Sequence, residues 1–419
     1  MPRTALRGGG DLPFLLCWRA LYWLYRFLLR EFCMKALVLN IKRDEWESTT
    51  GMNRVYVAQP ELDESKCPED ANKVIIKPRF TGFCGSDKGI WFRHAFKDLI
   101  FDSLEKEGQS QRICGHELLG EIVETGSYSA RHYGYKPGDI VSTESHIFCG
   151  KCYQCKIGEE HVCANHLIIG ISTDGCFAEY VKLPAKELWP TDIDAIRPEV
   201  AAIQEPLGNA VHACSRVDLR GKNVAIFGCG TIGLFSILVA RAMGATTVIG
   251  VDPSPDNLNL AEKLGVDLAL HVDLELVKEQ GALPDAEMVE VIRKRCLGEG
   301  VDVAFEMSGS NQALNTAIAA TRAGGDIILF GLSAGDYTLP DFQSIIMHGQ
   351  TLHGIVGRKV FQTWYTMSNL LKSKSHELQD KIYEVILNRG QGTLVSFDKF
   401  DRDAFDRVIR QHPKVILRY

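Results

Sequence analysis

Four of the chain's 13 cysteines lie close together in the stretch "HIFCGKCYQCKIGEEHVC", and their spacing is that of a metal site. The pattern C-x2-C-x2-C-x7-C can arrange four thiolates as a closed tetrahedron, which is how proteins hold structural zinc. A ferredoxin-type iron–sulfur run would need its fourth cysteine after three residues, followed by proline, and this stretch has neither. We therefore predict a structural zinc, held by Cys149, Cys152, Cys155 and Cys163.

A glycine motif, GxGxxG, lies in "NVAIFGCGTIGLFSILVA" between a predicted buried strand and a predicted helix. Gly228 allows a tight turn, Gly230 admits a pyrophosphate close to the backbone, and Gly233 lets the helix pack on the strand. Thr231 and Ile232 open the helix, whose first N–H groups and positive dipole end attract phosphate. The motif predicts a dinucleotide-binding loop.

Asp252 ends the next predicted strand, about 20 residues after the last glycine of the motif, where dinucleotide-binding proteins place an acid. Its carboxylate can accept hydrogen bonds from the adenosine ribose and repels a 2′-phosphate. The following "PSPDNLN" contains no arginine to bind such a phosphate. These features predict NAD rather than NADP as the cofactor.

The elements that must position these residues change character along the chain. Residues 34–190 read as short strands and turns, which favours a barrel-like β domain. Residues 191–354 alternate strands with helices, which predicts a parallel sheet covered on both faces. Residues 355–419 mix helices with short strands, and we expect them to return to the first domain. The fold class is therefore α/β.

Residues 1–33 read as an N-terminal extension that is apolar but carries Arg19, Arg26 and Arg30 on one helical face. Arginines in its middle disfavour insertion across a bilayer, and an interfacial helix is the alternative. We expect Met34 to be the true start, because "MKALVL" reads as an ordinary first strand.

The composition disfavours a protein that binds nucleic acid or an anionic membrane. A net charge of -6 in 419 residues leaves no electrostatic footprint for nucleic acid or an anionic membrane. The cysteines are odd in number and scattered, without a secretory pattern, which predicts a reducing, cytoplasmic location.

The stretch with the four cysteines, residues 146–163, is called the cysteine lobe below. Together with the glycine loop it resembles the zinc-dependent medium-chain alcohol dehydrogenases, and the resemblance covers Met34 to Tyr419. It implies a GroES-like β-barrel catalytic domain, a Rossmann domain that binds NAD, a second, catalytic zinc and a homo-oligomer, either a dimer or a tetramer. The implied partner is a small-molecule alcohol, whose hydride passes to the nicotinamide.

The resemblance also implies which residues hold the catalytic zinc. "GFCGSD" supplies Cys84, "CGHELLGE" supplies His116 and Glu117, and "QEPLGNAVH" supplies Glu205. Cys84 and His116, with either or both carboxylates, would leave one position open for substrate. Two neighbours of Cys84 have implied roles as well: Ser86 passes the hydroxyl proton outward, and Asp87 orients a metal ligand.

Within the family, "VSTESHIFCGKCYQCK", "AAIQEPLGNAVH" and "GIVGRKVFQTWYTMSNLL" resemble the threonine dehydrogenase subgroup, in which a residue matching His146 lies near the substrate. Gly89 stands where that subgroup has a relay histidine, and His94 is the nearest replacement in sequence. The stretch from Trp91 to His94 is expected to border the substrate pocket.

Other functions remain open from the sequence. The departures from the subgroup leave a polyol or sugar dehydrogenase as the alternative substrate class. A non-catalytic dinucleotide-binding relative would have lost its zinc ligands, and all four candidates are present. A zinc-binding nucleic-acid module is disfavoured by the acidic charge.

Overall fold

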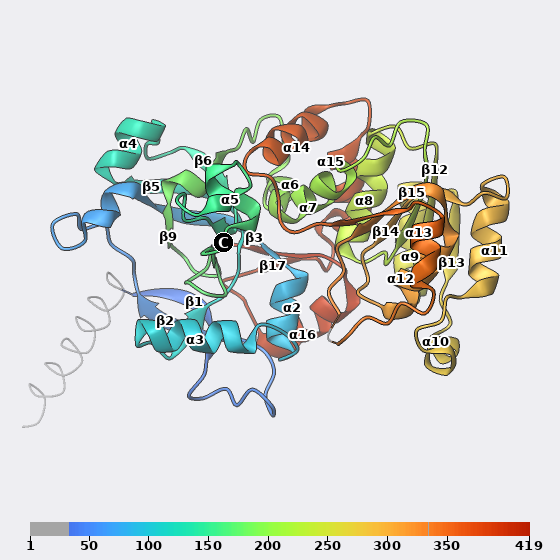
Figure 1. Ribbon diagram of the computed structural model, residues 1–419. Coiled ribbons are helices and arrows are strands. Elements are labelled where there is room, and N and C mark those ends of the chain that lie inside the picture. Colours follow the sequence, from blue (N-terminus) through green and yellow to red (C-terminus); the bar gives the residue numbers. More distant parts are fainter. Residues whose placement is uncertain (1–32, 334) are drawn as a thin grey trace, which may run out of the picture.

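The computed structural model describes residues 33–333 and 335–419, so the expectation for the N-terminal extension lies, apart from Cys33, outside the described residues. The protein is α/β and has two lobes (Figure 1). The strands of the first half make one lobe, and a parallel sheet with its helices makes the other. In the described residues, no helix is long and apolar enough to cross a membrane.

The first lobe is built from mostly antiparallel sheets, with β17 and β18 paired in parallel at one edge. One sheet has the order β2 (Asn53–Ala58), β1 (Cys33–Asn40), β4 (Gln111–Ile113). The larger sheet has the order β10 (Leu188–Pro190), β6 (Ile140–Thr143), β5 (Glu117–Thr125), β3 (Lys73–Phe83), β18 (Val415–Arg418), β17 (Leu394–Ser396), and β9 (Val181–Pro184) also pairs with β3. A short pair, β7 (His146–Ile147) and β8 (Leu167–Ile168), flanks the cysteine lobe.

Helices of the first lobe are short. They are α2 (Gly85–Trp91), α3 (Lys97–Glu107), α4 (Ser127–Tyr133) and α5 (Tyr153–Lys156), with the 3-10 turns η1 (Pro68–Asn72), η2 (Glu160–Val162) and η3 (Ala185–Glu187). The C-terminal helix α16 (Arg402–Gln411) packs here as well, because Phe405 and Ile409 belong to the same apolar core as Phe83. Strand β18 follows it and pairs antiparallel with β3, so the end of the chain lies in this lobe (Figure 1).

The second lobe is a six-stranded parallel sheet with helices on its faces. Its order is β13 (Leu268–His271), β12 (Thr247–Asp252), β11 (Asn223–Phe227), β14 (Val301–Glu306), β15 (Thr321–Leu329), β16 (Thr351–Gly354). The helices are α8 (Thr231–Ala242), α9 (Pro255–Leu264), α10 (Leu274–Gln280), α11 (Ala286–Arg295), α12 (Asn311–Ala320) and α13 (Phe342–Met347). This arrangement, with β11 at the centre, is the predicted Rossmann fold.

Helices between the two lobes complete the chain: α6 (Pro198–Ala201), α7 (Gln204–Cys214), α14 (Gln362–Lys372) and α15 (Leu378–Lys381), followed by the turns η4 (Ile382–Ile386) and η5 (Asn388–Gly390). Helix α7 is buried along almost its whole length, and α8 and α14 both pack against it. Its apolar residues join the core of the second lobe, while its polar side chains, among them Gln204 and His212, are buried with hydrogen-bond partners. Helix α7 therefore fixes Glu205, in its first turn, at the junction of the lobes.

Candidate functional site

Three of the four expected ligands of the catalytic metal lie together where β3 ends and β5 begins. Cys84 follows β3 and caps α2, while His116 and Glu117 stand at the start of the neighbouring strand β5. One ligand atom from each residue lies within 4.8 Å of the others. Because β3 and β5 are paired, residues far apart in the sequence converge at one sheet end.

Glu117 is fully buried and has two neighbours that explain how a carboxylate is tolerated there. It lies opposite Gly82 in the strand pairing, where a Cβ would stand 1.7 Å from its Oε2, so only glycine leaves room. Lys414, equally buried, donates to the Glu117 carboxylate and, at 3.2 Å, to the carbonyl of Phe83. The ion pair satisfies a charge that would be costly alone.

Asp87 and Ser86 frame the imidazole of His116. The Nδ1 atom of His116 lies 3.7 Å from Oδ1 of Asp87, whose other oxygen accepts the backbone N–H of Cys84 at 2.9 Å. The hydroxyl of Ser86 lies 3.3 Å from Nε2 on the other side of the ring. Burial lowers the pKa of His116, but Asp87 and the Cys84 thiolate raise it more, to well above its ordinary value. A carboxylate behind a histidine is the arrangement that orients a metal ligand.

Glu205, the fourth expected ligand, points to a second buried cluster. Its Oε1 pairs with Nη1 of Arg358 at 2.8 Å, and its Oε2 is buried without a partner among the described residues. Arg358 also binds Glu144 through Nε at 2.7 Å, and Trp364 donates to Glu144 at 3.0 Å. Burial raises the pKa of Glu144, but the guanidinium outweighs it and holds that pKa far below the usual range.

His146 lies at the edge of this cluster and is held through one ring nitrogen. Its Nδ1 is 3.2 Å from Oε1 of Glu144 and 3.2 Å from Nη2 of Arg358. Its Nε2 has no partner among the described residues, so it is available to a bound molecule.

The four cysteines converge as their spacing predicts, with all four sulfur atoms within 4.8 Å of one another. The Sγ atoms of Cys152 and Cys155 are 3.5 Å apart, and those of Cys152 and Cys163 are 3.8 Å apart. These distances are far from a disulfide bond and close to the separation of about 3.8 Å between thiolates on one tetrahedral zinc. Backbone N–H groups of Lys151 and Cys152 lower the pKa of Cys149 to about 6, which favours the thiolate.

The glycine loop has the predicted form between β11 and α8. Gly228 has a φ of 99°, and a Cβ on Gly233 would stand 1.8 Å from the carbonyl oxygen of Gly228. Nothing lies within 4 Å of the Cβ position of Gly230, so the helix N-terminus is open to a ligand. Thr231 donates to the carbonyl of Pro413 at 2.5 Å, which ties the loop to the first lobe.

Asp252 holds the glycine loop through its carboxylate. Its Oδ2 accepts the N–H of Cys229 at 2.7 Å, and its Oδ1 accepts from Ser254 at 2.8 Å and from Asn257 at 3.1 Å. The carboxylate is 5% exposed, and Oδ2 keeps one lone pair for a further donor.

Comparison with known proteins agrees with this geometry. The family model for an alcohol dehydrogenase GroES-like domain matches residues 70–193, and that for a zinc-binding dehydrogenase matches residues 231–373. An L-threonine 3-dehydrogenase of Pyrococcus horikoshii is 38% identical over 348 residues, which are 83% of this chain and 91% of the relative. One from Bacillus subtilis is 35% identical over 325 residues, 76% of this chain and 85% of the relative.

The chain belongs to the zinc-dependent medium-chain alcohol dehydrogenases. Solved structures of the family agree. A zinc-binding dehydrogenase of Sinorhizobium meliloti bound to NADP has a TM-score of 0.71 at 25% identity, covering 92% of this chain and 99% of that one. Galactitol-1-phosphate dehydrogenase of Escherichia coli has a TM-score of 0.72 at 25% identity, covering 92% and 100%. The predictions of family, fold class, enzyme class and cofactors are confirmed.

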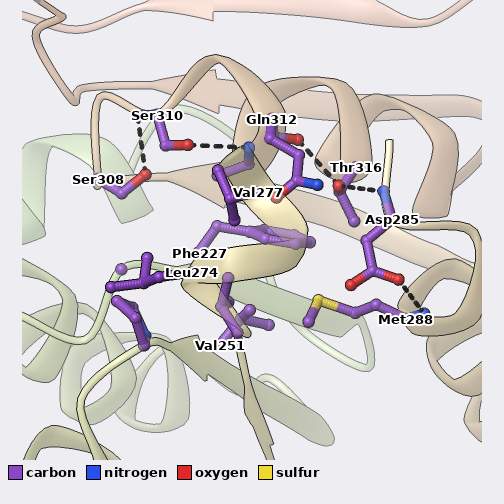
Figure 2. Close-up of a pocket in the computed structure, with 14 residues that line it drawn as sticks. Phe227, Val251, Leu274, Val277, Asp285, Met288, Ser308, Ser310, Gln312 and Thr316 are labelled. Carbon is purple, nitrogen blue, oxygen red and sulfur yellow. Dashed lines mark hydrogen bonds between the residues drawn. The ribbon is translucent and has the colours of Figure 1, made fainter. Parts of the chain in front are cut away.

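A cavity of about 240 Å³ lies at the carboxyl edge of the Rossmann sheet (Figure 2). Gly228, Val251 and Pro253, on the glycine loop and around Asp252, line one side of it. Helices α10, α11 and α12 supply the opposite walls. A crevice outside the carboxyl ends of parallel strands is where this fold binds a dinucleotide.

The stretch after Cys84 differs from the expectation that it borders the substrate pocket. Trp91 is buried in the core of the first lobe and donates to Asp406 at 2.8 Å, and Arg93 is buried with its guanidinium on backbone carbonyls. The side chain of His94 is exposed. A Cβ on Gly89 already stands 2.9 Å from the Cβ of Ala95, so the space of the family's relay histidine is filled by this turn.

Two charged residues beside the candidate site were not predicted from the sequence. Lys414 and Glu144 were not singled out, although each is buried and pairs with a charged residue of the site. The lysine lies in the unremarkable "HPKVILRY", and Glu144 lies two residues before His146. Their only signal was a charged residue within an otherwise apolar strand pattern.

Proposed function

We propose that this dehydrogenase oxidises the 3-hydroxyl of L-threonine with NAD. The support is the buried cluster in which Arg358 joins Glu144 and Glu205 beside His146 and the Cys84 group. Relatives named L-threonine 3-dehydrogenase match over most of their length. A site with buried charges of both signs suits a small zwitterion better than a plain alcohol.

Cys84, His116 and Glu117 are the proposed ligands of the catalytic zinc, with the unpartnered oxygen of Glu205 as the candidate fourth. Zinc supplies Lewis acidity that lowers the pKa of a bound alcohol, and the nicotinamide accepts the hydride. Asp87 fixes the orientation of the His116 imidazole from its Nδ1 side, so that Nε2 faces the metal.

Two side chains act on the substrate in this proposal. Ser86 takes the hydroxyl proton, because its own hydroxyl lies 3.3 Å from His116 at the metal group. In the tautomer whose Nδ1 accepts from Arg358, the neutral ring of His146 carries its proton on the unpartnered Nε2 and donates it to the substrate. The proton then leaves through water, because Gly89 and Ala95 leave no room for a relay histidine.

Cofactor and structural metal have separate proposed sites. Gly228, Gly230, Thr231, Ile232 and Gly233 would hold the pyrophosphate, and Asp252 would accept a ribose hydroxyl and exclude a 2′-phosphate. Cys149, Cys152, Cys155 and Cys163 would hold the structural zinc.

A polyol or sugar dehydrogenase is the second candidate. It is favoured by the absence of a relay histidine at Gly89 and by the likeness to galactitol-1-phosphate dehydrogenase. The domain limits 34–190, 191–354 and 355–419, a cytoplasmic location, and a homo-oligomer of two or four chains complete the proposal.

A substrate panel tests the function. NAD reduction is followed with L-threonine, L-serine, sorbitol, glucose and 2,3-butanediol on the zinc-loaded protein, and His146→Asn and Arg358→Lys are run beside wild type. We expect L-threonine to give the highest kcat/KM and Arg358→Lys to lose most of it, because a lysine cannot bridge two carboxylates. A polyol preferred over threonine would establish the second candidate instead.

A further inference from the structure

The cavity at the carboxyl edge of the Rossmann sheet has an apolar interior and one charged wall (Figure 2). Its interior is lined by Phe227, Val272, Leu274, Val277, Met288 and Ala313. An apolar lining of this kind suits an aromatic ring system. Asp285 carries the charge, at the point where α11 begins.

The order of groups along a dinucleotide decides what enters this cavity. The open helix N-terminus at Gly230 suits the pyrophosphate, and Asp252 follows at the ribose position. Gly228 of the same loop and Val251 and Pro253, which flank Asp252 in the sequence, line the cavity. The base attached to that ribose is therefore the group that reaches the cavity.

Asp285 is held so that one oxygen faces this base. Its Oδ1 accepts the N–H of Met288 at 2.9 Å, and its own N–H donates to Thr316 at 3.0 Å. Its Oδ2 accepts no hydrogen bond from any described residue, and Figure 2 shows this second oxygen on the cavity side. Because both the backbone and the first oxygen are fixed, the second oxygen cannot turn away without losing the helix cap.

We propose that Asp285 recognises the adenine base of the cofactor by accepting a hydrogen bond from its exocyclic amine. A carboxylate can only accept, so it pairs with an amino group and repels the carbonyl oxygen that hypoxanthine carries at the same position. The inference rests on the proposed use of NAD and adds a selection that the glycine loop and Asp252 do not make.

Direct binding separates this inference from the proposed function. The zinc-loaded protein is titrated with NADH and with the reduced hypoxanthine dinucleotide, and Kd is read from nicotinamide fluorescence. We expect wild type to bind NADH at least about tenfold more tightly, the effect of one hydrogen bond to a charged group that is partly exposed to solvent. Asp285→Asn retains a capping oxygen and adds a donor, so the two Kd values should come within about threefold.

Asp401→Asn is the matched control, because Asp401 caps the ten-residue helix α16 through Ala404 at 2.8 Å, far from the cavity wall. Its preference for NADH should equal that of wild type. The proposed recognition of adenine by Asp285 is wrong if wild type binds the two dinucleotides with equal Kd values. It is also wrong if Asp285→Asn keeps the preference for NADH. Failure to bind either dinucleotide overturns the proposed use of NAD instead.

Discussion

Buried carboxyls show at the scale of single residues how this chain manages charge, and at Glu187 burial outweighs the nearby ammonium of Lys186, whose Nζ lies 3.3 Å from Oε1. Glu187 is fully buried, both its oxygens lack a hydrogen bond in the described structure, and burial raises its pKa to about 8. The folded protein therefore retains this proton from about pH 4.5 to 8, whereas the unfolded chain releases it near 4.5. The contribution of this protonated carboxyl to the free energy of unfolding is fully present below about pH 4.5 and is lost as the pH rises to about 8.

We predict that Glu187→Gln is more stable than wild type at high pH, with the difference vanishing at low pH. The expected gain above about pH 8 is on the order of 4 kcal/mol, since the neutral amide has no proton to lose. Urea midpoints of both proteins at about pH 5, 6.5 and 8.5 measure it. A constant difference across this range would show that the carboxyl is ionised in the folded protein throughout.

Asp252 combines two tasks, so its substitution must separate them. We predict that Asp252→Asn weakens NAD binding but raises the affinity for NADP relative to NAD by about tenfold, because the repulsion of a 2′-phosphate is removed. Loss of the bond to the N–H of Cys229 loosens the loop for both dinucleotides, so the ratio of Kd values isolates the charge. An unchanged ratio would mean that the ribose lies elsewhere.

The motifs that the sequence predicted are those whose residues lie close together along the chain. The cysteine cluster and the glycine loop are local, so spacing alone fixed their geometry. Lys414 pairs with Glu117 across 297 residues, and Arg358 with Glu144 across 214. Such pairs depend on which strands become neighbours, and no local pattern in a single sequence encodes that.

At the scale of elements, the cysteine lobe touches the loop that carries Arg358. Glu159 of the lobe pairs with Lys359 at 3.2 Å, and the ring of His161 packs edge-on against His212, which binds the carbonyl of Gly357 at 2.8 Å. A metal held by the four cysteines would therefore also steady the residues next to Arg358.

We predict that Cys163→Ser reduces the zinc content from two ions per chain to one, lowers Tm, and lowers kcat severalfold through the loosened Gly357–Lys359 loop. Metal analysis, thermal melting and turnover measure the three effects. Glu159→Gln is the control that breaks the contact to Lys359 while leaving the four thiolates in place. Retention of two zinc ions in Cys163→Ser would remove the structural site from the proposal.

The position of helix α3 could not be predicted from the sequence. The stretch from Trp91 to His94 was expected beside the substrate, but it leads into α3, which Ile100 and Leu104 bury in the core of the first lobe. Phe101 stacks edge-on with Trp46 at 5.9 Å between ring centroids. The length of an insertion gives no information about the face on which it packs, because that depends on apolar partners elsewhere in the chain.

For the whole molecule, the open edge of the Rossmann sheet bears on the proposed homo-oligomer. Strand β16 is the last strand of the sheet order, and the adjacent helix α13 exposes Phe342, Ile346 and Met347 at 56%, 65% and 80%. An unpaired strand edge beside exposed apolar side chains is a surface that soluble proteins cover. In the proposed homo-oligomer, a second copy across a two-fold axis would cover it with the same surface.

We predict that Ile346→Glu with Met347→Glu shifts the protein to a smaller assembly, because paired copies would bring four buried charges together without partners. Sedimentation velocity at several protein concentrations measures the size, and NADH binding reports whether each chain remains folded. Leu297→Glu is the matched control, since Leu297 is 95% exposed on the turn after α11 and away from this edge. If the double variant sediments like wild type, the contact between chains lies on another face, and the exposed lobe around Tyr153 becomes the next surface to test.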